Sequence, residues 1–506
     1  MGKIVSIKAL AKIISKTKIK GKRIVLCHGV FDLLHIGHIN HFQEAKNYGD
    51  ILIVTLTPDQ YVNKGPNRPA FKEEDRLKAL ASLNVVDYVA LNKSATAVSA
   101  INELKPSVYC KGQDYKLHRN DTSGQIKNEI KALRQNGGKI IYTKGAAFSS
   151  SNLLNKFSQI SSPEQKNDIN KIKKKYSFLK IKKLFENFKK LKILIIGETI
   201  IDQYFFCDAL GKSGKEPVLV LRDLKTEQYL GGASAISRHV SQFCDKITLL
   251  SMLGEKAEFL KEIKENLPRK INFNYIRKKN SPTILKKRFL DIITNNKILG
   301  VYKINDDTLT NAEQKSFNKK LTKLLPKHDL VIVSDYGHGL ISKKSAEIIC
   351  KKSKYLALNA QINAANIGYH SMRKYKNVDC VIINEKEIRY ELRDKNGNIK
   401  LLMKKLSQEQ KIKNMIVTKG INGSIFYNKE KNKFNHSDAF AKKAVDKIGA
   451  GDAMLSIIAI CLKSRFDEKL ALLTASLAAA YSVETIGNKE TINKIKILNS
   501  IEHLLK

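Results

Sequence analysis

Two histidines three positions apart, His35 and His38, are the side chains whose type and spacing most clearly indicate chemistry. They follow the apolar run 24–26 and Gly29, which predicts a buried strand, a glycine turn and then a helix start. Backbone N–H groups at a helix start favour anions, and two imidazoles on one side of it can hydrogen-bond phosphate oxygens. The pattern therefore predicts a site that holds a nucleoside triphosphate and stabilises negative charge around its α-phosphorus.

A second candidate site is the turn Gly449-Ala450-Gly451-Asp452, which directly precedes the apolar run 453–458. Glycines let the backbone come close to a γ-phosphate, and the N–H groups of the helix start neutralise it. Asp452 is placed to take a proton from an attacking alcohol. We therefore expect phosphoryl transfer here, with the glycine turn at the nucleotide and Asp452 as the catalytic base.

The elements that must position these two sites follow two successive α/β patterns. In residues 1–157, helix-like segments separate strand-like runs at 24–26, 51–56, 88–91, 107–110 and 139–142. This alternation predicts parallel strands with crossover helices, as in a Rossmann-like α/β domain. Residues 158–190 are predicted to be a polar, basic linker followed by an amphipathic helix that leads into a second α/β domain over 191–506. Within that domain, a short β-meander at 217–230 is predicted to form a lid over a small substrate.

The composition narrows the class of protein. Lys and Arg number 91 against 48 Asp and Glu, a formal net charge of +43, yet the lysines are spread along all 506 residues. A solvated lysine surface is therefore favoured over nucleic-acid binding, although its field would attract phosphate substrates. The seven cysteines are odd in number and far apart, which favours a reducing cytoplasm. The most apolar segments, 453–462 and 470–483, are too short to insert across a membrane and are predicted to be buried helices.

The first domain resembles the HxGH nucleotidyltransferases, in particular the cytidylyltransferase-like domain of bifunctional ADP-heptose synthases. Blocks at 28–38, 63–69 and 111–115, with Arg76, carry this resemblance. It implies that Lys64 and Lys111 neutralise phosphates and that Arg76 supports the triphosphate or the scaffold. By the same resemblance, His35, His38 and Lys64 are catalytic and Asp114 contacts the substrate, while the remaining nucleotide-binding positions are Gly29, Phe31, Asp32, Gly37, Ser149 and Ser150.

From about residue 192 onward, the chain resembles ribokinase-like sugar kinases of the PfkB family. Blocks at 231–233, 334–339, 384–387 and 417–420 occur in the family's order, between Asp202 and the glycine turn. The resemblance implies a metal site in which Asn384 and Glu387 organise Mg²⁺, although a solvated carboxylate on a helix face is an equal alternative for Glu387. The positions expected at the sugar are Asp202, Gly231, Gly232 and Asp335, and those expected at the nucleotide are Thr418, Gly420, Gly423, Gly449, Ala450 and Gly451.

Several departures from the heptose kinases concern the sugar. Ser234 and Ala235 stand where an asparagine is usual, His338 stands where a lysine is common, and 359–363 replaces an Asp-Pro-Lys-like block. The order of the domains is also reversed, because the heptose enzymes place the kinase first. These changes leave the identity of the sugar open.

The sequence thus predicts a bifunctional enzyme that makes a nucleotide-activated sugar such as ADP-heptose. The kinase would use ATP and Mg²⁺ on a sugar, with heptose 7-phosphate as the leading candidate. The transferase would join a sugar 1-phosphate to a nucleotide. One alternative is a CTP-dependent cytidylyltransferase for an alditol or sugar phosphate, fused to a kinase of other specificity. A distant alternative is a nucleic-acid-binding protein on an inactive scaffold, and a homodimer through the kinase lid is also expected.

Overall fold

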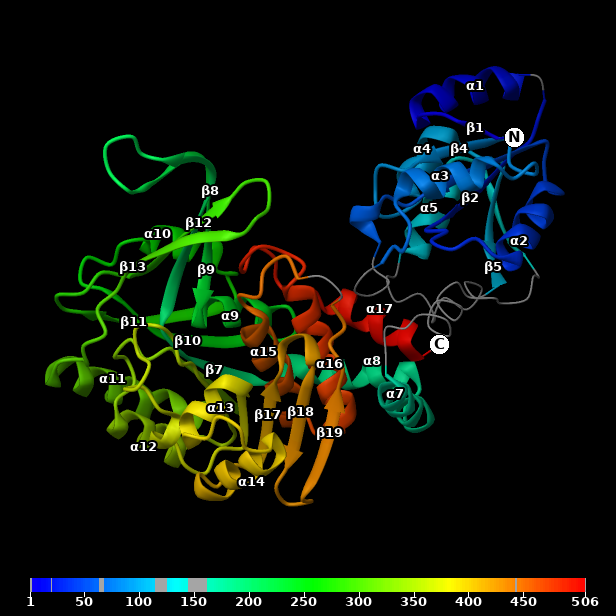
Figure 1. The fold of residues 1–506 in the computed structure, drawn as a ribbon. Coiled ribbons are helices and arrows are strands. Elements are labelled where there is room, and N and C mark those ends of the chain that lie inside the picture. The colour runs from blue at the N-terminus through cyan, green and yellow to red at the C-terminus, as the bar shows by residue number, and fades with distance from the viewer. Residues whose placement is uncertain are drawn as a thin grey trace. The chain divides into compact units, whose positions relative to one another are not determined.

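The computed structural model describes residues 2–19, 21–62, 68–113, 125–143, 162–441 and 444–505. Contacts divide the chain into two compact units, Met1–Ile160 with Ile495–Lys506, and Ser161–Lys494. Both are α/β, which confirms the predicted fold class (Figure 1). No helix in these described ranges combines the length and apolarity that crossing a bilayer requires.

The first unit is built on a parallel six-stranded sheet with the order β1-β4-β3-β2-β5-β6. The strands are β1 (Lys3–Ile4), β2 (Ile24–Gly29), β3 (Ile51–Leu56), β4 (Tyr88–Leu91), β5 (Val108–Gly112) and β6 (Lys139–Thr143). Helices α1 (Ile7–Ile19), α4 (Val98–Leu104) and α5 (Ile126–Gln135) share one apolar cluster with the sheet. Helices α2 (Ile36–Lys46) and α3 (Glu73–Ala81) contribute to another. Because both faces are covered, the strands are continuously apolar.

The strand order of this sheet identifies where a ligand can bind. From β2, the chain adds β3 and β4 on one side and later β5 and β6 on the other. The order therefore reverses between β2 and β5, and ligands of open α/β sheets bind beyond the carboxyl ends of the strands at such a point. The histidine motif follows β2, and Lys111 lies near the end of β5.

The segment predicted to be a polar linker is helical where the structure describes it. Helix α7 (Pro163–Lys175) has Ser162 as its N-cap and proline at its first position, and it buries Ile169 and Ile172. Helix α8 (Phe178–Glu186) is the predicted amphipathic helix. The helix α7 was not predicted, because the Ser-Pro pair that marks its start is also typical of a polar segment.

The second unit is centred on a nine-stranded sheet with the order β11-β10-β7-β14-β15-β16-β17-β18-β19. Its strands are β7 (Lys192–Gly197), β10 (Lys246–Gly254), β11 (Ile271–Lys278), β14 (Leu330–Asp335), β15 (Leu356–Ala360), β16 (Cys380–Asn384), β17 (Asn414–Thr418), β18 (Ser424–Asn428) and β19 (Lys433–Ser437). The first seven in this order are parallel, and β18 and β19 add an antiparallel end.

Two helical layers cover this sheet (Figure 1). The core on one face is shared by α11 (Asn311–Leu324), α12 (Lys343–Lys352), α13 (Glu385–Leu392) and α14 (Ile399–Glu409). The sheet is also contacted by α9 (Ala233–Ser241), α15 (Ala450–Lys463) and α16 (Glu468–Ser482). The two segments predicted to be buried helices are α15 and α16, and both are almost wholly buried. Among the described residues, the second unit also contains α10 (Leu260–Asn266) and the short 3₁₀ helices η4 (Asn187–Lys190), η5 (Leu325–Lys327), η6 (Met372–Lys374) and η7 (Gly420–Asn422). The first unit also contains η1 (Asp59–Tyr61) and nearly all of α17 (Lys494–Leu505).

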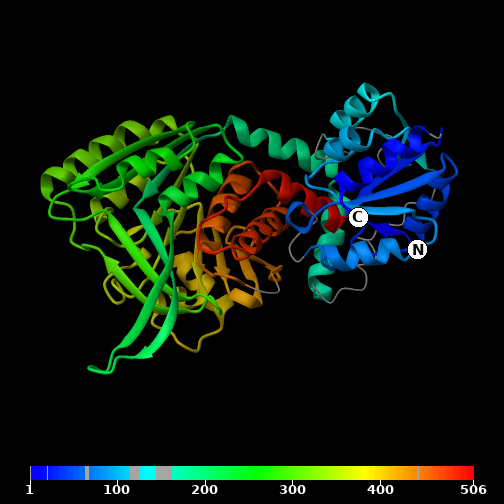
Figure 2. The same ribbon diagram turned by 90° about the horizontal axis from the view of Figure 1, so that it is seen from above.

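The lid is a separate four-stranded sheet with the order β13-β12-β8-β9. It consists of β8 (Thr199–Lys212), β9 (Leu219–Gly232), β12 (Ile284–Asp291) and β13 (Lys297–Lys303). Figure 2 shows the green β8–β9 hairpin projecting from the unit. The predicted meander is thus one continuous strand, β9, paired with β8. The later pair β12–β13 was missed, because nothing local to it indicates pairing with β8.

Candidate active sites

The histidine motif of the first unit forms a compact aromatic cluster at the start of α2. His35 is the N-cap of the helix, and its Nδ1 accepts a hydrogen bond from the Gly37 N–H at 3.1 Å. The rings of His35 and His38 stack with their centroids 4.0 Å apart, and the Phe31 ring meets His38 edge-on. A Cβ on Gly29 would lie 2.9 Å from the Phe31 ring. Gly29 therefore leaves room for the aromatic ring that supports His38.

Asp32 and Arg76, both expected at the nucleotide, are buried and bind the protein's own backbone. Asp32 accepts hydrogen bonds from the Ala70 N–H at 2.6 Å and from Arg68 Nε at 2.5 Å. Arg76 donates to the carbonyls of Val30 and Phe71 and forms an ion pair with Asp59. For Arg76 this geometry favours the scaffold alternative, in which it fixes the loop around the histidine motif.

Lys111, expected at a phosphate, lies near the end of β5 with its ammonium 3.4 Å from the Glu129 carboxylate. Glu129 also accepts hydrogen bonds from the Tyr109 hydroxyl and the Ala97 N–H, both at 3.0 Å. Burial raises the pKa of Glu129, but Lys111 and these donors outweigh it and hold the pKa below its usual range. Sequence reasoning missed Glu129, because it lies on α5 and not on the strand that carries Lys111.

His28, the first residue of the motif, is a buried structural histidine. Its Nδ1 lies 3.0 Å from Thr55 Oγ1 and its Nε2 3.3 Å from Thr57 Oγ1. Burial, reinforced by Lys111, lowers the pKa of His28 to about 4, so the imidazole is neutral at pH 7. The other predicted residues of this domain, Lys64, Asp114, Ser149 and Ser150, lie outside the described residues.

The second unit contains a cleft of about 1220 Å³ between the lid and the carboxyl ends of the central strands. Predicted residues from widely separated parts of the chain share its lining. They are Asp202, Gly232, Asn384, Glu387, Thr418, Gly420, Gly423, Gly449, Ala450, Gly451 and Asp452. The cleft therefore brings together most of the positions expected at the sugar, the metal and the nucleotide.

The glycine turn begins α15 at the floor of this cleft. Gly449 has φ 88°, and a Cβ there would lie 2.3 Å from Asn488 Oδ1, so only glycine fits. Asp452 lies in the first turn of α15 and its Oδ1 accepts a hydrogen bond from the Tyr336 hydroxyl at 2.8 Å. Burial raises the pKa of Asp452 to about 7, and the Asp202 charge adds to that shift. A carboxylate with a pKa near neutrality is suited to accept a proton and release it again.

The part of the cleft beside Asp202 contains two basic side chains that the sequence did not single out. Arg288, on β12, forms an ion pair with Asp202 on the neighbouring strand β8. Lys286, two positions earlier on β12, is only 7% exposed, and burial lowers its pKa. Its ammonium lies 5.4 Å from the centre of the Tyr302 ring. Buried cations beside an open cleft favour an anionic ligand.

Of the two glycines expected at the sugar, Gly231 lies against Asp202 and Gly232 lines the cleft. A Cβ on Gly231 would lie 2.2 Å from Asp202 Oδ2, so this glycine leaves space for the carboxylate. Gly232 lines the cleft with φ 60°, where a Cβ would lie 2.4 Å from the Glu198 carbonyl oxygen. Gly231 therefore makes room for Asp202, and Gly232 lets the backbone pass close to Glu198.

Asn384 and Glu387 form a reciprocal capping box at the start of α13. Asn384 Oδ1 accepts from the Glu387 N–H at 2.9 Å, and Glu387 Oε2 accepts from the Asn384 N–H at 2.8 Å. Glu387 is only 4% exposed, and burial raises its pKa to about 7. The alternative of a solvated carboxylate on a helix face was therefore wrong, because the capping box holds the side chain inward.

These oxygens fit a metal that arrives with the nucleotide. In the described ranges, no group of three or more His, Cys, Asp or Glu residues could hold a metal ion. Mg²⁺ typically takes one or two protein oxygens and obtains its other ligands from water and substrate phosphates. Asn384 and Glu387 are a pair of this kind at the edge of the cleft.

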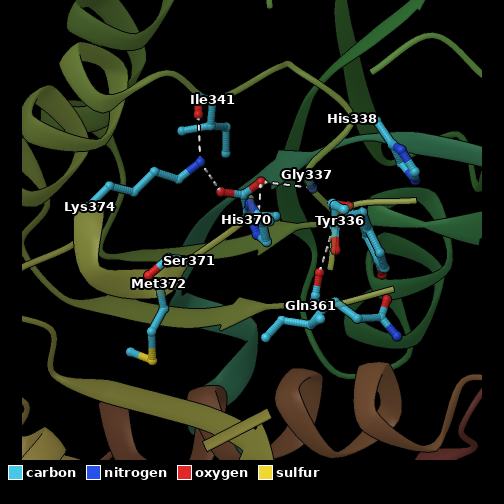
Figure 3. Close-up of polar contacts among 12 residues, drawn as sticks. Tyr336, Gly337, His338, Ile341, Gln361, His370, Ser371, Met372 and Lys374 are labelled. Carbon is cyan, nitrogen blue, oxygen red and sulfur yellow. Dashed lines mark hydrogen bonds and ion pairs between the residues drawn. The ribbon is translucent and has the colours of Figure 1, made fainter. Parts of the chain in front are cut away.

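Asp335, expected at the sugar, lies in a buried polar cluster and not among the residues that line the cleft. Its carboxylate accepts hydrogen bonds from the Tyr375 hydroxyl at 2.7 Å and the Gly337 N–H at 3.1 Å, and Lys374 Nζ lies 2.7 Å away. Figure 3 shows Lys374 also reaching the Ile341 carbonyl, with His370 beside the cluster. Asp335 therefore fixes the loop that follows β14.

Comparison with known proteins agrees with this geometry. Residues 190–495, more than half of the chain, match the profile described as pfkB family carbohydrate kinase. The chain belongs to the pfkB family. Residues 26–156, ahead of the pfkB domain, match the profile described as cytidylyltransferase-like. The predicted combination of a sugar kinase domain with a nucleotidyltransferase domain is confirmed.

Curated relatives match in the N-terminal domain. A protein named bifunctional protein HldE from Geobacter metallireducens is 44% identical over 115 residues, which are 22% of this chain and 24% of the relative. The protein of the same name from Aliarcobacter butzleri is 41% identical over 133 residues, 26% of this chain and 28% of the relative. The chain thus matches about a quarter of the length of these relatives.

Solved structures resemble the pfkB domain in fold. Phosphofructokinase-2 from Escherichia coli in complex with potassium has a TM-score of 0.51 at 13% identity, covering 62% of this chain and all of that one. The same enzyme in complex with substrates and products has a TM-score of 0.50 at 14% identity, with the same coverage. At these identities the likeness establishes the ribokinase-like fold.

Proposed function

We propose that this chain is a bifunctional enzyme that makes a nucleotide-activated sugar. Its pfkB domain phosphorylates a sugar that already carries a phosphate, with heptose 7-phosphate as the leading candidate. Its N-terminal domain joins a sugar 1-phosphate to a nucleoside monophosphate, giving a product such as ADP-heptose. The observation that carries this proposal is the pfkB cleft, where Asp452 follows a glycine turn and shares the lining with the buried cations Lys286 and Arg288.

In the proposed kinase reaction, the amides of the glycine turn stabilise charge on the γ-phosphoryl group. An acceptor hydroxyl attacks the γ-phosphorus, its proton passes to the Asp452 carboxylate, and the bond to the β,γ-bridging oxygen breaks to release ADP. Thr418, Gly420 and Gly423 border the nucleotide. Mg²⁺, when bound, neutralises phosphate charge, and Asn384 and Glu387 are the residues that would hold it or its waters.

Lys286 and Arg288 support an acceptor with a phosphate of its own. Lys286 lies opposite Asp202 on the neighbouring strand, and burial lowers its pKa although the Asp202 charge raises it. A buried ammonium of this kind gains from a phosphate that enters the site. Asp202 holds Arg288 in place and remains available to a sugar hydroxyl through its second oxygen. A phosphate on the acceptor would add a second anion beside Lys286 and Arg288, which favours a sugar phosphate over a free sugar.

In the proposed transferase reaction, a phosphate oxygen of the sugar 1-phosphate attacks the α-phosphorus of the nucleoside triphosphate, and pyrophosphate leaves. His35 and His38 stabilise the charge that develops, together with the amides at the start of α2. Lys64 and Lys111 neutralise phosphates, Asp114 contacts the sugar phosphate, and Ser149 and Ser150 contact the nucleotide. The 44% identity to a bifunctional protein HldE supports this assignment.

The test is to incubate the purified chain with ATP, Mg²⁺ and a panel of heptose and hexose phosphates. ADP formation and pyrophosphate release are measured separately, the second with both ATP and CTP. We expect ADP with a phosphorylated sugar and pyrophosphate with a sugar 1-phosphate. If no member of the panel yields either ADP or pyrophosphate, the proposal is overturned.

The same assay separates the two alternatives. Pyrophosphate with CTP and an alditol or sugar phosphate, but not with ATP, would favour the cytidylyltransferase alternative. The nucleic-acid alternative requires tight binding to duplex DNA or RNA with a steep salt dependence, unaffected by His38→Ala or Asp452→Asn.

The lid supports a homodimer as the assembly of this enzyme. Every residue of β13 is exposed, including the apolar side chains of Leu299 and Val301. An exposed apolar strand at the edge of a sheet favours pairing with a second surface, and a second copy of the lid presents one. Light scattering should give twice the chain mass, and Leu299→Glu with Val301→Glu should return it to the monomer value.

A further inference from the structure

We propose that Tyr336 is a positioning residue for the kinase base, whose hydroxyl orients the Asp452 carboxylate and stabilises its ionised form. This inference rests on the proposed role of Asp452. Tyr336 lies directly after β14 and is 4% exposed, and its hydroxyl donates to Asp452 Oδ1 at 2.8 Å. The two residues are 116 positions apart in the chain, and both line the cleft.

The backbone of Tyr336 is fixed by hydrogen bonds from both sides. Its N–H donates to Glu198 Oε2 at 3.1 Å. Its carbonyl oxygen accepts from Asn363 Nδ2 at 2.9 Å and from Asn366 Nδ2 at 2.8 Å. Three side-chain hydrogen bonds to one peptide segment leave the tyrosine little freedom, so its hydroxyl occupies a defined place before substrate binds.

The two asparagines that hold the Tyr336 carbonyl lie in a segment whose sequence differs from that of other sugar kinases. Asn363 and Asn366 belong to the stretch that begins where the Asp-Pro-Lys-like block is missing. Figure 3 shows Gly337 close to His370. A Cβ on Gly337 would lie 2.4 Å from Asn366 Nδ2, so glycine is required for the amide to reach the Tyr336 carbonyl. The replacement segment therefore supports the catalytic base through Tyr336.

The charges facing Asp452 set the direction of the effect. Asp202 from β8 opposes its ionisation, and Lys286 from β12 favours it, while the Asp202 charge is itself compensated by Arg288. Burial is the largest influence and raises the pKa of Asp452 to about 7, whereas the Tyr336 hydrogen bond lowers it. Removing the hydroxyl should therefore raise the pKa of Asp452 further.

The test compares Tyr336→Phe with Tyr375→Phe. Tyr375 is also buried and also donates its hydroxyl to a carboxylate, that of Asp335, but it does not contact Asp452. The pKa of Asp452 is read by NMR of protein labelled with ¹³Cγ-aspartate, and Asp452→Asn assigns the signal. We expect a rise of about one pH unit in Tyr336→Phe, since a hydrogen bond to a charged group is of that order, and no shift in Tyr375→Phe. An unshifted Asp452 signal in Tyr336→Phe would overturn the inference.

Kinase rates give a second readout. The acidic limb of the kcat profile should move upward in Tyr336→Phe, costing about tenfold at pH 6 and recovering by pH 9, with KM for ATP unchanged. A loss that is equal at all pH values would contradict the inference. An inactive wild-type chain would instead count against the proposed function, and the NMR titration would still decide the role of Tyr336.

A measurement on the unmodified protein covers the case in which Tyr336→Phe fails to fold. The ¹³Cζ resonance of Tyr336 should shift with pH at the same midpoint as the Asp452 carboxyl, because the hydrogen bond links the two groups. A Tyr336 resonance that does not respond at that midpoint would overturn the inference.

Discussion

Both candidate sites lie at helix starts, but they handle charge in opposite ways. At the start of α2, stacked imidazoles are supported by an aromatic ring and by buried side chains from nearby in the sequence. At the start of α15, the Asp452 carboxylate has a raised pKa, accepts a hydrogen bond from Tyr336 directly after β14, and feels the charge of Lys286 on the lid strand β12. The first arrangement suits attack by a phosphate that is already ionised, whereas the second suits attack by a hydroxyl that must lose a proton. Both sites use the backbone N–H groups of a helix start, and the protonation state of the nucleophile accounts for the different side chains beside them.

The largest expected effect comes from silencing one site at a time by point mutation. Asp452→Asn should lower the kinase kcat by about 10²–10⁴-fold, because general-base catalysis contributes that much, and leave pyrophosphate release intact. His38→Ala should do the reverse. Both are measured on the same preparation with the two product assays. If either change silences both reactions in a folded protein, the comparison of two independent sites is wrong.

Recognition of the acceptor gives the next largest effect. Lys286→Met should raise the KM for a phosphorylated acceptor by about 10–100-fold, since a charge-assisted hydrogen bond in a buried site is lost, without changing the KM for ATP. Lys287→Met is the matched control, because neighbouring residues of a strand point to opposite faces and Lys287 is absent from the cleft lining. Equal effects of the two changes would contradict the proposed phosphate contact.

A smaller effect concerns the stability of the N-terminal domain. The pKa of His28 is about 4 when folded against 6.5 as its ordinary value, so the unfolded chain binds more protons between those values and stability falls as the pH drops through that window. The titration of His28 alone should lower the free energy of unfolding by about 2 kcal/mol between pH 8 and pH 5. Hydrogen exchange, resolved by domain, should show this loss reduced in His28→Gln. A pH dependence unchanged in that variant would assign the loss to other groups.

The smallest expected effect tests whether Glu387 only caps α13 or also holds Mg²⁺. Glutamine can keep the capping box, so Glu387→Gln should change the free energy of unfolding by less than about 1 kcal/mol. If the carboxylate holds Mg²⁺ or its waters, the Mg²⁺ concentration for half-maximal kinase rate should rise about tenfold. The Mg²⁺ dependence of pyrophosphate release in the same variant is the control. An unchanged kinase requirement would leave Glu387 with the capping role alone.

The sequence predicted what is local. A strand, a glycine turn and a helix start are encoded within a dozen neighbouring residues. Strands β2 to β6, the two helix starts and the buried helices α15 and α16 therefore followed from patterns of apolar residues and glycines. The helix α7 was missed because it is basic and buries only two apolar side chains, Ile169 and Ile172.

What the sequence could not provide is contact between distant segments. Arg288 reaches Asp202 across 86 positions, and this pair depends on β12 joining β8 in parallel after a long excursion of the chain. Tyr336 reaches Asp452 only because β14 and α15 meet in the folded unit. Lys286 looks in the sequence like any of the many other lysines. Its burial, not its type, distinguishes it.

The length of β8 has a mechanical consequence. This strand carries Asp202 near its inner end and continues to Lys212 at the tip of the hairpin, and it is paired with the strand that bears Lys286 and Arg288. A tilt of the hairpin about the short connection between β7 and β8 would therefore displace all three charged groups as one rigid body. Covalent tethering of the hairpin in one orientation should then fix the positions of these three groups as well as access to the cleft.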